Sequence, residues 1–385
     1  MQKKKILVAM SGGVDSSVTA ALLKEEGHEV AGATIRTWAS GECVDRNTRA
    51  CCGLSGVEDA RDVAQTLGIP YWVFNFEKEF KKYVVDYFAA EYLKGRTPNP
   101  CVACNEHIKF RLFLARARQL EYDFIATGHY AKLGRDEATG SLYIEEGVDR
   151  VKDQSYVLFP LGKEILENLF LPLGRFTKSE IRAKAKEFNL SVMNKPDSQE
   201  ICFIPSNDYG AFLEREFLGD EARREPGVIR TEDGTVLGQH NGFFHYTRGQ
   251  RRGLGIAHTE RLYVLETDPK KNEVIVGRKS DVLGQSCLVG RVNWFLKPDF
   301  SRPVRAHVKI RSQHEKAPTT LSEYFSENTS QDTARLPAWQ GSFIRVDFDE
   351  PQDAITPGQG AVFYDGPRVL GGGWIDHEKR PSPGR

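Results

Sequence analysis

The sequence predicts an α/β protein with an N-terminal parallel-sheet domain, a small central domain and a C-terminal β-barrel. Three observations lead to this prediction. Apolar runs alternate with amphipathic segments over the first half of the chain, and a loop rich in glycine and serine follows the first run. Beyond about residue 206, glycine and short β-like runs replace long helical periodicity. Alternating strands and helices imply a parallel sheet with right-handed crossovers.

The expected elements of the first half follow from local pattern. Lys5–Ala9 is a short apolar run bounded by charge, which is typical of a buried strand. A helix is expected from Val18 to Glu26, with Gly27 as its stop. A capping box, Thr177–Glu180, predicts the start of a later helix. The other expected elements are strands at 30–35, 69–76 and 124–127, helices at 57–67, 80–94, 105–120 and 177–189, a polar loop at 36–55 and a hairpin at 132–148.

The stretch Ala9–Ser17 joins the first strand to the first helix. At such a junction, unpaired backbone N–H groups and the positive end of the helix dipole favour an anion. Gly12 and Gly13 let the backbone approach that anion closely. Asp15 is suited to hold a magnesium ion that bridges phosphates. No Gly-Lys-Ser/Thr sequence follows, so this is not the usual P-loop of kinases and GTPases.

The second half of the chain predicts β structure. Strands are expected at 287–294, 304–311, 341–348 and 360–364, which suggests a small barrel. Three arginines, Arg248, Arg251 and Arg252, lie among glycines, which favours a phosphate-binding nest. The alternative is a solvated face, the usual role of an exposed arginine cluster. The expected domains are 1–205, 206–283 and 284–380, with a flexible insertion at about 315–340 and disorder after about Asp376.

Composition limits the possible classes of protein. Lys plus Arg and Asp plus Glu both number 53, so a general nucleic-acid binder is not expected, although a local basic face is compatible with this balance. The sequence has no apolar run that approaches a membrane span and no apolar signal core, so a soluble cytoplasmic protein without membrane partners is expected. The seven cysteines, partly paired, favour metal or redox chemistry over a secreted disulfide framework.

The sequence Ser11-Gly12-Gly13-Val14-Asp15-Ser16 resembles the pyrophosphate-binding loop of the ATP pyrophosphatases, or PP-loop enzymes. These enzymes cut ATP between the α and β phosphates and attach AMP to an oxygen of the substrate. The resemblance implies ATP and Mg²⁺ as cofactors. The expected ATP-binding residues are Ala9, Met10, Ser11, Gly12, Gly13, Val14, Asp15 and Ser16, with Ile35 and Gly128 flanking the adenosine.

Further motifs resemble the tRNA-specific 2-thiouridylases over nearly the whole chain. They are Thr97-Pro98-Asn99-Pro100, Cys104-Asn105, Gly128-His129-Tyr130, Lys152 to Tyr156, Asp197 to Phe203, Thr247 to Gly255 and Pro357-Gly358-Gln359. This family replaces the 2-oxygen of the wobble uridine of certain tRNAs with sulfur. Because that oxygen is a poor leaving group, it must be activated with AMP before a thiolate-borne sulfur can displace it.

The resemblance also implies residue roles and partners. Cys202 would carry the persulfide, and Cys104 would release the sulfur by forming a disulfide. The target base would lie against Asn99, Pro100 and Cys101. The partners would be tRNA, expected to be those for Glu, Gln and Lys, and a cysteine desulfurase or sulfur-relay protein as donor. The expected tRNA contacts are His129, Lys152, Asp153, Gln154, Arg311, Ser312 and Gln359.

Cys101 departs from part of the family, because some members carry an acid–base aspartate there. Cys101, Cys104 and Cys202 could together hold a [4Fe–4S] cluster with one open iron position. The rival hypothesis, which we favour, is a persulfide relay in which Cys101 is a spare or resolving thiol. A zinc site is a third hypothesis. No role is predicted for Cys43, Cys51, Cys52 or Cys287. The alternative function is that of a PP-loop synthetase acting on a small molecule, which would need no such thiols.

Overall fold

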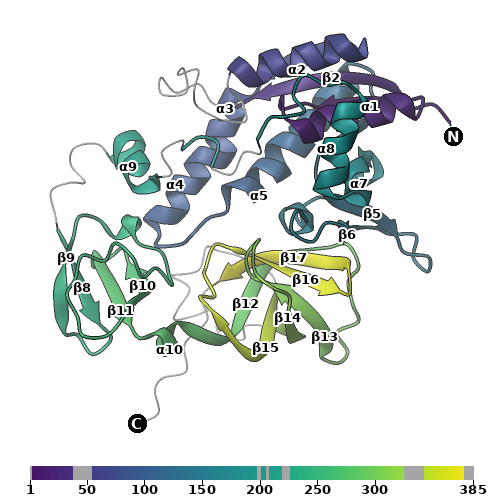
Figure 1. Ribbon diagram of the computed structural model, residues 1–385. Helices are drawn as coiled ribbons and strands as arrows, with labels where there is room; N and C mark the ends of the chain where they lie inside the picture. Colours follow the sequence, from purple (N-terminus) through teal and green to yellow (C-terminus); the bar gives the residue numbers. More distant parts are fainter. Residues whose placement is uncertain are drawn as a thin grey trace. The chain divides into compact units, whose positions relative to one another are not determined.

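The structure is a computed structural model that describes residues 2–37, 54–196, 201–204, 208–218, 226–324 and 342–376. The chain forms two compact units. Unit 1 contains residues 1–87, 100–208 and 367–369, and unit 2 contains residues 88–99, 209–366 and 370–385. Figure 1 traces the course of the chain through the elements of each unit.

Unit 1 is built on a parallel sheet with strand order β3-β2-β1-β4-β7. Leu7 of β1 pairs with Ala31 of β2 on one side and with Ile125 of β4 on the other, both in parallel. The carboxyl ends of β1 and β4 therefore lie side by side. The strands are β1 (Lys5–Ala9), β2 (Glu29–Arg36), β3 (Tyr71–Asn75), β4 (Phe124–Ala126) and β7 (Leu169–Phe170). The expected parallel sheet is confirmed.

Both faces of this sheet are covered. Ile6, Leu7 and Val8 are consecutive and fully buried, and successive side chains of a strand point to opposite faces. Ile6 and Val8 belong to one apolar cluster with residues of α1, α2 and α8. The helices of this cluster are α1 (Val14–Glu25), α2 (Leu54–Leu67) and α8 (Lys178–Glu187). As the sequence predicts, α8 starts with a complete capping box from Thr177 to Glu180.

Two long helical stretches of the first half contain wider π-helical turns. The stretch at 77–93 consists of α3 (Glu77–Phe80), η2 (Lys81–Val85) and α4 (Asp86–Leu93). The stretch at 100–119 consists of α5 (Pro100–Cys104), η3 (Asn105–Leu112) and α6 (Phe113–Gln119). The predicted start at residue 105 is therefore wrong. Pro100 is the first helical residue, because its fixed φ suits that position and the missing N–H would be unpaired there anyway.

The expected hairpin in unit 1 is confirmed. It consists of β5 (Ala131–Arg135) and β6 (Leu142–Glu146), which are antiparallel, and β6 also pairs with Arg368. The short elements that follow are η4 (Ser155–Leu158), α7 (Lys163–Glu167) and η5 (Pro172–Arg175).

Unit 2 contains a four-stranded sheet of order β10-β11-β8-β9 and a closed barrel. The barrel order is β12-β15-β14-β13-β16-β17, and β17 pairs with β12 to close it. The strands are β8 (Gly227–Thr231), β9 (Val236–His240), β10 (Tyr263–Asp268), β11 (Glu273–Gly277), β12 (Leu283–Trp294), β13 (Val304–Lys309), β14 (Ala317–Tyr324), β15 (Phe343–Asp353), β16 (Gly360–Asp365) and β17 (Arg368–Asp376). The helical elements are α9 (Tyr209–Leu213), η6 (Glu214–Leu218), η8 (Phe243–His245) and α10 (Lys279–Val282).

The first part of the predicted insertion at 315–340 is a strand instead. Within β14 the side chains of Ala317, Thr319 and Leu321 are buried in alternation, and Leu321 pairs with Val304 of β13. The prediction failed because Pro318 interrupts the run, and proline argues against a central strand. Residues 325–341 and the predicted tail after Asp376 lie outside the described residues.

Candidate active site

The loop after β1 is shaped by its own hydrogen bonds. Gly13 is the N-cap of α1, which begins at Val14 rather than at residue 18. The Ser11 backbone N–H donates to Ser16 Oγ at 3.1 Å, and Ser17 Oγ donates to the carbonyl oxygen of Gly13 at 2.8 Å. Gly12 has a φ of +70°, and a Cβ there would lie 2.2 Å from the carbonyl oxygen of Gly56. The loop therefore requires glycine at residue 12.

Gly128 lies against this loop at the carboxyl end of β4. A Cβ on Gly128 would lie 2.9 Å from the backbone nitrogen of Ser16 and 3.0 Å from the carbonyl carbon of Asp15. The sheet thus brings two predicted ATP-site segments together, although more than 100 residues separate them. Ile35, the other predicted adenosine neighbour, is half-buried near the end of β2.

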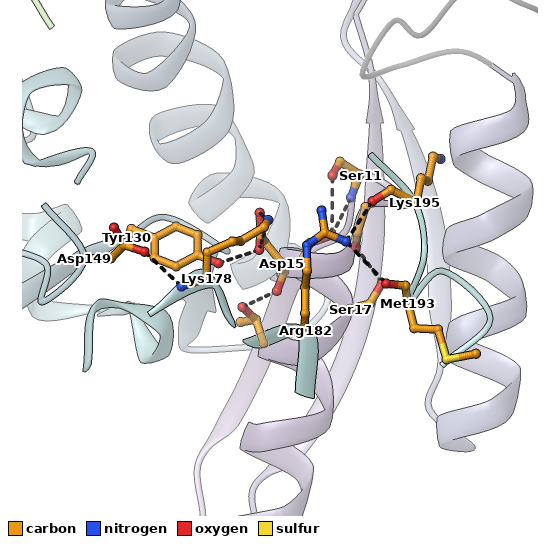
Figure 2. A network of polar contacts seen from close by, with 12 residues as sticks. Ser11, Asp15, Ser17, Tyr130, Asp149, Lys178, Arg182, Met193 and Lys195 are labelled. Carbon is orange, nitrogen blue, oxygen red and sulfur yellow. Dashed lines mark hydrogen bonds and ion pairs between the residues drawn. The ribbon is translucent and has the colours of Figure 1, made fainter. Parts of the chain in front are cut away.

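Asp15 is the centre of a polar network that links three elements of unit 1. Lys178 Nζ lies 2.8 Å from both Asp15 carboxylate oxygens, and Tyr130 OH donates to Asp15 Oδ1 at 2.7 Å. The backbone N–H of Lys178 donates to Asp149 Oδ2 at 2.9 Å. Figure 2 shows Lys178 and Tyr130 converging on Asp15. Sequence reasoning missed Lys178, although its place in the capping box of α8 fixes where that lysine lies.

Two further cations lie along the same network. Lys195 Nζ donates to the carbonyl oxygen of Gly12 at 3.0 Å and is also paired with Asp59 of α2. Arg182 Nη1 lies 3.4 Å from the carbonyl oxygens of both Met193 and Lys195. Figure 2 draws these contacts as dashed lines from Arg182. Both residues are remote in sequence from the loop, so no local pattern identifies them.

The residues present fit ATP with Mg²⁺. Because Gly12 and Gly128 have no Cβ, Gly12 packs closely against Gly56 and Gly128 packs against the first turn of α1. The N-terminus of such a helix favours an anion. Lys178 and Lys195 supply positive charge beside the loop, and Asp15 supplies a carboxylate of the kind that Mg²⁺ prefers. This arrangement is suited to binding a polyphosphate and to stabilising the charge of a departing pyrophosphate.

The cysteines of the predicted relay differ in exposure. Cys101 is exposed in the first turn of α5, Cys104 is buried one turn later, and Cys202 is half-buried. Both cysteine-bearing segments pack on the helical stretch Glu77–Val85. The α5 helix contacts η2, and the ring of Phe203 lies 5.7 Å from that of Phe80. The fold thus brings two segments that are far apart in sequence onto one helix.

The proposed metal sets do not assemble in this conformation. Within the described ranges, which include Cys101, Cys104 and Cys202, no three His, Cys, Asp or Glu side chains form a group that could hold a metal ion. The donor arrangement therefore does not fit a [4Fe–4S] cluster or a zinc ion on these residues. The Asp197–Glu200 stretch and Cys43, Cys51 and Cys52 lie outside the described residues.

His129, a predicted tRNA contact, is buried in this conformation. Its Nδ1 lies 2.8 Å from Thr127 Oγ1, and its ring lies 5.5 Å from that of Phe110. Burial, helped by the nearby charge of Lys109, lowers the pKa of His129 to about 3. The imidazole is therefore neutral near pH 7, and in this conformation it supports the end of β4.

The predicted tRNA contacts at 152–154 are half-buried and take part in local structure. Asp153 Oδ1 accepts from the backbone N–H of Gly147 at 3.0 Å, and Gln154 Oε1 accepts from the backbone N–H of Tyr130 at 3.0 Å. The backbone of Lys152 bonds to Asp149. These contacts organise the segment that carries Tyr130 toward Asp15.

In unit 2, Gln359 holds the segment that precedes Pro100. Gln359 Nε2 donates to the carbonyl oxygens of Thr97 and Pro98 at 3.0 and 3.1 Å. Gly358 has a φ of +92°, and a Cβ there would lie 2.9 Å from the Thr97 carbonyl oxygen. Asn99, at the end of this segment, is half-buried.

The other predicted RNA contacts of unit 2 differ in exposure and in their bonds within the protein. Arg248 donates to the carbonyl oxygens of Leu265 and Val282, so it stabilises the loop from within. Arg251 and Arg252 are exposed, and Gly249, Gly253 and Gly255 have positive φ. Arg311 and Ser312 are half-buried in the turn after β13.

The fold and this loop define an α/β protein of the HUP class. The family model described as "tRNA methyl transferase HUP domain" matches residues 4–206, the matching "PRC-barrel domain" model covers 215–278, and the "Aminomethyltransferase beta-barrel domain" model covers 284–375.

Curated relatives identify the family within this class. The tRNA-specific 2-thiouridylase MnmA of Acetivibrio thermocellus is 45% identical over 97% of this chain and 100% of its own length. That of Geobacter metallireducens is 47% identical over 97% of both chains. The solved NMN synthetase of Francisella tularensis aligns at a TM-score of 0.33, with 14% identity over 51% of this chain and 67% of its own. The chain belongs to the tRNA-specific 2-thiouridylase family.

Among the described residues, every helix is too short or too polar to cross a membrane.

Proposed function

We propose that this protein is an ATP-dependent tRNA sulfurtransferase that converts the wobble uridine to 2-thiouridine. One observation carries the proposal: unit 1 contains both the loop at Ala9–Ser16, which is suited to a polyphosphate, and two cysteine-bearing segments that pack on one helix. An adenylating loop alone would suit any PP-loop synthetase. The addition of Cys104 and Cys202 favours sulfur chemistry over the small-molecule alternative, and also over the methyl transfer named by the family model.

In the proposed first step, the C2 oxygen of uridine attacks the α-phosphorus of ATP and pyrophosphate leaves. Residues Ala9–Ser16 would bind the nucleotide, with Ile35 and Gly128 beside the adenosine. Asp15 would hold Mg²⁺, which supplies charge neutralisation between the phosphates. Lys178, released from its ion pair with Asp15, would contact the departing pyrophosphate, because its ammonium group already lies beside the loop.

In the proposed second step, the terminal sulfur of a Cys202 persulfide attacks C2 and AMP leaves. The thiolate of Cys104 then attacks the Cys202 sulfur, so the S–S bond to the base breaks and a Cys104–Cys202 disulfide forms. The base keeps the sulfur as a thiocarbonyl, and an external thiol must reduce the disulfide before the next turnover. The burial of Cys104 supports this assignment, because it keeps water away from the sulfur.

The persulfide relay is better supported than a cluster. The three thiols do not gather into a metal group among the described residues, and a relay needs only two of them. Asn99, Pro100 and Cys101 would lie against the target base, and Cys101 is exposed in the first turn of α5. The proposed substrates are the tRNAs for Glu, Gln and Lys. The proposed sulfur donor is a cysteine desulfurase or a relay protein, and the proposed location is the cytoplasm.

Incubation with unmodified tRNA, Mg-ATP and a persulfide donor tests the function directly. We expect AMP, pyrophosphate and tRNA-bound 2-thiouridine in equal amounts, measured by chromatography and by mass spectrometry of the digested tRNA. Omission of ATP should leave the uridine unchanged, because its C2 oxygen cannot leave without activation. Pyrophosphate release without any thiolated nucleoside would instead favour another adenylating enzyme.

Arg251 and Arg252 are expected to contact tRNA phosphates. Their joint change to Ala should weaken tRNA binding and flatten its salt dependence by about 0.7 in log–log slope for each lost contact. Binding is measured by filter retention across a salt series. The matched control is Lys270→Ala with Lys271→Ala, because this exposed basic pair lies in the turn between β10 and β11. An unchanged slope in the arginine variant would identify Arg251 and Arg252 as a solvated face.

A further inference from the structure

Gln154 joins two parts of the proposed reaction through hydrogen bonds that lie wholly within unit 1. Its backbone N–H donates to the carbonyl oxygen of Tyr130 at 2.9 Å, and its side-chain Oε1 accepts from the Tyr130 backbone N–H at 3.0 Å. Gln154 therefore forms hydrogen bonds with both polar groups of the Tyr130 backbone. This pair of bonds fixes the position of the Tyr130 backbone and thus of its Cα atom.

Tyr130 transmits that constraint to the nucleotide loop. Tyr130 is 3% exposed, so packing restricts the rotation of its side chain, and its hydroxyl donates to Asp15 Oδ1 at 2.7 Å. A carboxylate that must meet a metal ion gains from a neighbour that fixes its orientation. The position of Asp15 thus depends on Gln154 through one tyrosine.

The segment that contains Gln154 is also hydrogen-bonded to the helical stretch that carries Cys104. The backbone N–H of Val157 donates to the carbonyl oxygen of Gln154 at 3.2 Å, and Asn105 Nδ2 donates to the carbonyl oxygen of Val157 at 3.2 Å. Asn105 is 2% exposed and directly follows Cys104. Both α5 and η3 pack against η4, the turn that contains Val157.

We propose that Gln154 is a positioning residue that holds Asp15, through Tyr130, and the Cys104 helix, through Val157 and Asn105, in one fixed geometry. This inference rests on the proposed function, because it assigns the two ends of the path to adenylation and to sulfur transfer. It differs from a direct tRNA contact by Gln154, which the family resemblance implies. In the positioning role, the essential feature of Gln154 is the acceptor Oε1.

Two substitutions at residue 154 separate these roles. Gln154→Glu keeps an acceptor at the position of Oε1 but adds a negative charge that would repel RNA phosphates. Gln154→Met keeps the length of the side chain but removes the acceptor. If Gln154 is a positioning residue, the Gln154→Glu variant should retain at least about half of the wild-type kcat for pyrophosphate release. The Gln154→Met variant should lower this kcat about tenfold, which corresponds to one lost hydrogen bond. The dissociation constant of tRNA should be unchanged in both variants.

Asn105→Leu tests the other end of the path. It should lower the 2-thiouridine formed per pyrophosphate released, while pyrophosphate release itself stays near the wild-type rate. Gln119→Ala is the matched control, because Gln119 is an exposed glutamine at the end of α6.

The inference is overturned if Gln154→Glu loses as much activity as Gln154→Met, or if either variant weakens tRNA binding and flattens its salt dependence. It is also overturned if Gln154→Met is as active as wild type. A wild-type protein that releases pyrophosphate but makes no 2-thiouridine would instead contradict the proposed function. The failure of the inference is therefore distinguishable from that of the function.

Discussion

Asp15→Ala is expected to abolish pyrophosphate release from ATP, with a loss of about a thousandfold or more. Asp15 is the carboxylate of the loop, and its oxygens lie 2.8 Å from Lys178 Nζ and 2.7 Å from the Tyr130 hydroxyl. Without it, Mg²⁺ would lose its proposed protein ligand, and Lys178 would lose its ion-pair partner. Release of pyrophosphate is measured with and without tRNA.

Asp15→Asn distinguishes charge from geometry at the same residue. Asparagine keeps an oxygen for the Tyr130 hydroxyl but removes the negative charge that would attract Mg²⁺. We therefore expect Asn to be as inactive as Ala. Asp62→Ala, on the exposed face of α2, serves as the matched control and should be fully active. An active Asp15→Asn protein would mean that Asp15 only orients its neighbours, and normal release by Asp15→Ala would refute the assignment.

Local sequence was sufficient for the elements whose signals are local. Runs such as Lys5–Ala9 are apolar and bounded by charge, so β1 could be predicted without knowledge of its neighbours. The capping box predicted the start of α8 for the same reason. Two of the wrong predictions concern proline. The helix expected at 105–120 starts five residues earlier, at Pro100, and Pro318 interrupts the run that forms β14 in the centre of the barrel sheet.

The candidate site was only partly predictable, because several of its residues reach the loop only through tertiary packing. The loop at Ala9–Ser16 carries its own glycine and serine pattern, so it was recognisable alone. Lys178, Tyr130 and Lys195 reach that loop only through the packing of α8 and β4 around α1. Arg248 and His129 are residue types that commonly contact nucleic acid. In the structure, however, Arg248 donates to the carbonyl oxygen of Leu265, and His129 is buried.

The three thiols provide the other large effect. Cys104→Ser and Cys202→Ser should each abolish 2-thiouridine formation, because sulfur transfer needs both a carrier and a resolving thiol. Pyrophosphate release should persist in both, since the nucleotide loop is unaffected. Cys101→Ser should retain substantial thiolation if the relay is correct, because its exposed thiol is not a required member. Cys287→Ala, a buried thiol of the barrel core, is the control and should be active.

The chemical state of the protein provides an independent measurement. Under the relay, aerobic turnover should trap a Cys104–Cys202 disulfide, detected by mass spectrometry of non-reduced peptides. Iron-free protein should be fully active with Mg-ATP and a persulfide donor. Under the cluster mechanism, Cys101→Ser would be as inactive as the other two variants. Loss of all activity on removal of iron, with recovery on anaerobic reconstitution, would refute the relay. The α5 helix, which carries Cys104, contacts η2, and Phe203 contacts Phe80, so the expected disulfide would join two segments that pack on the same helical stretch.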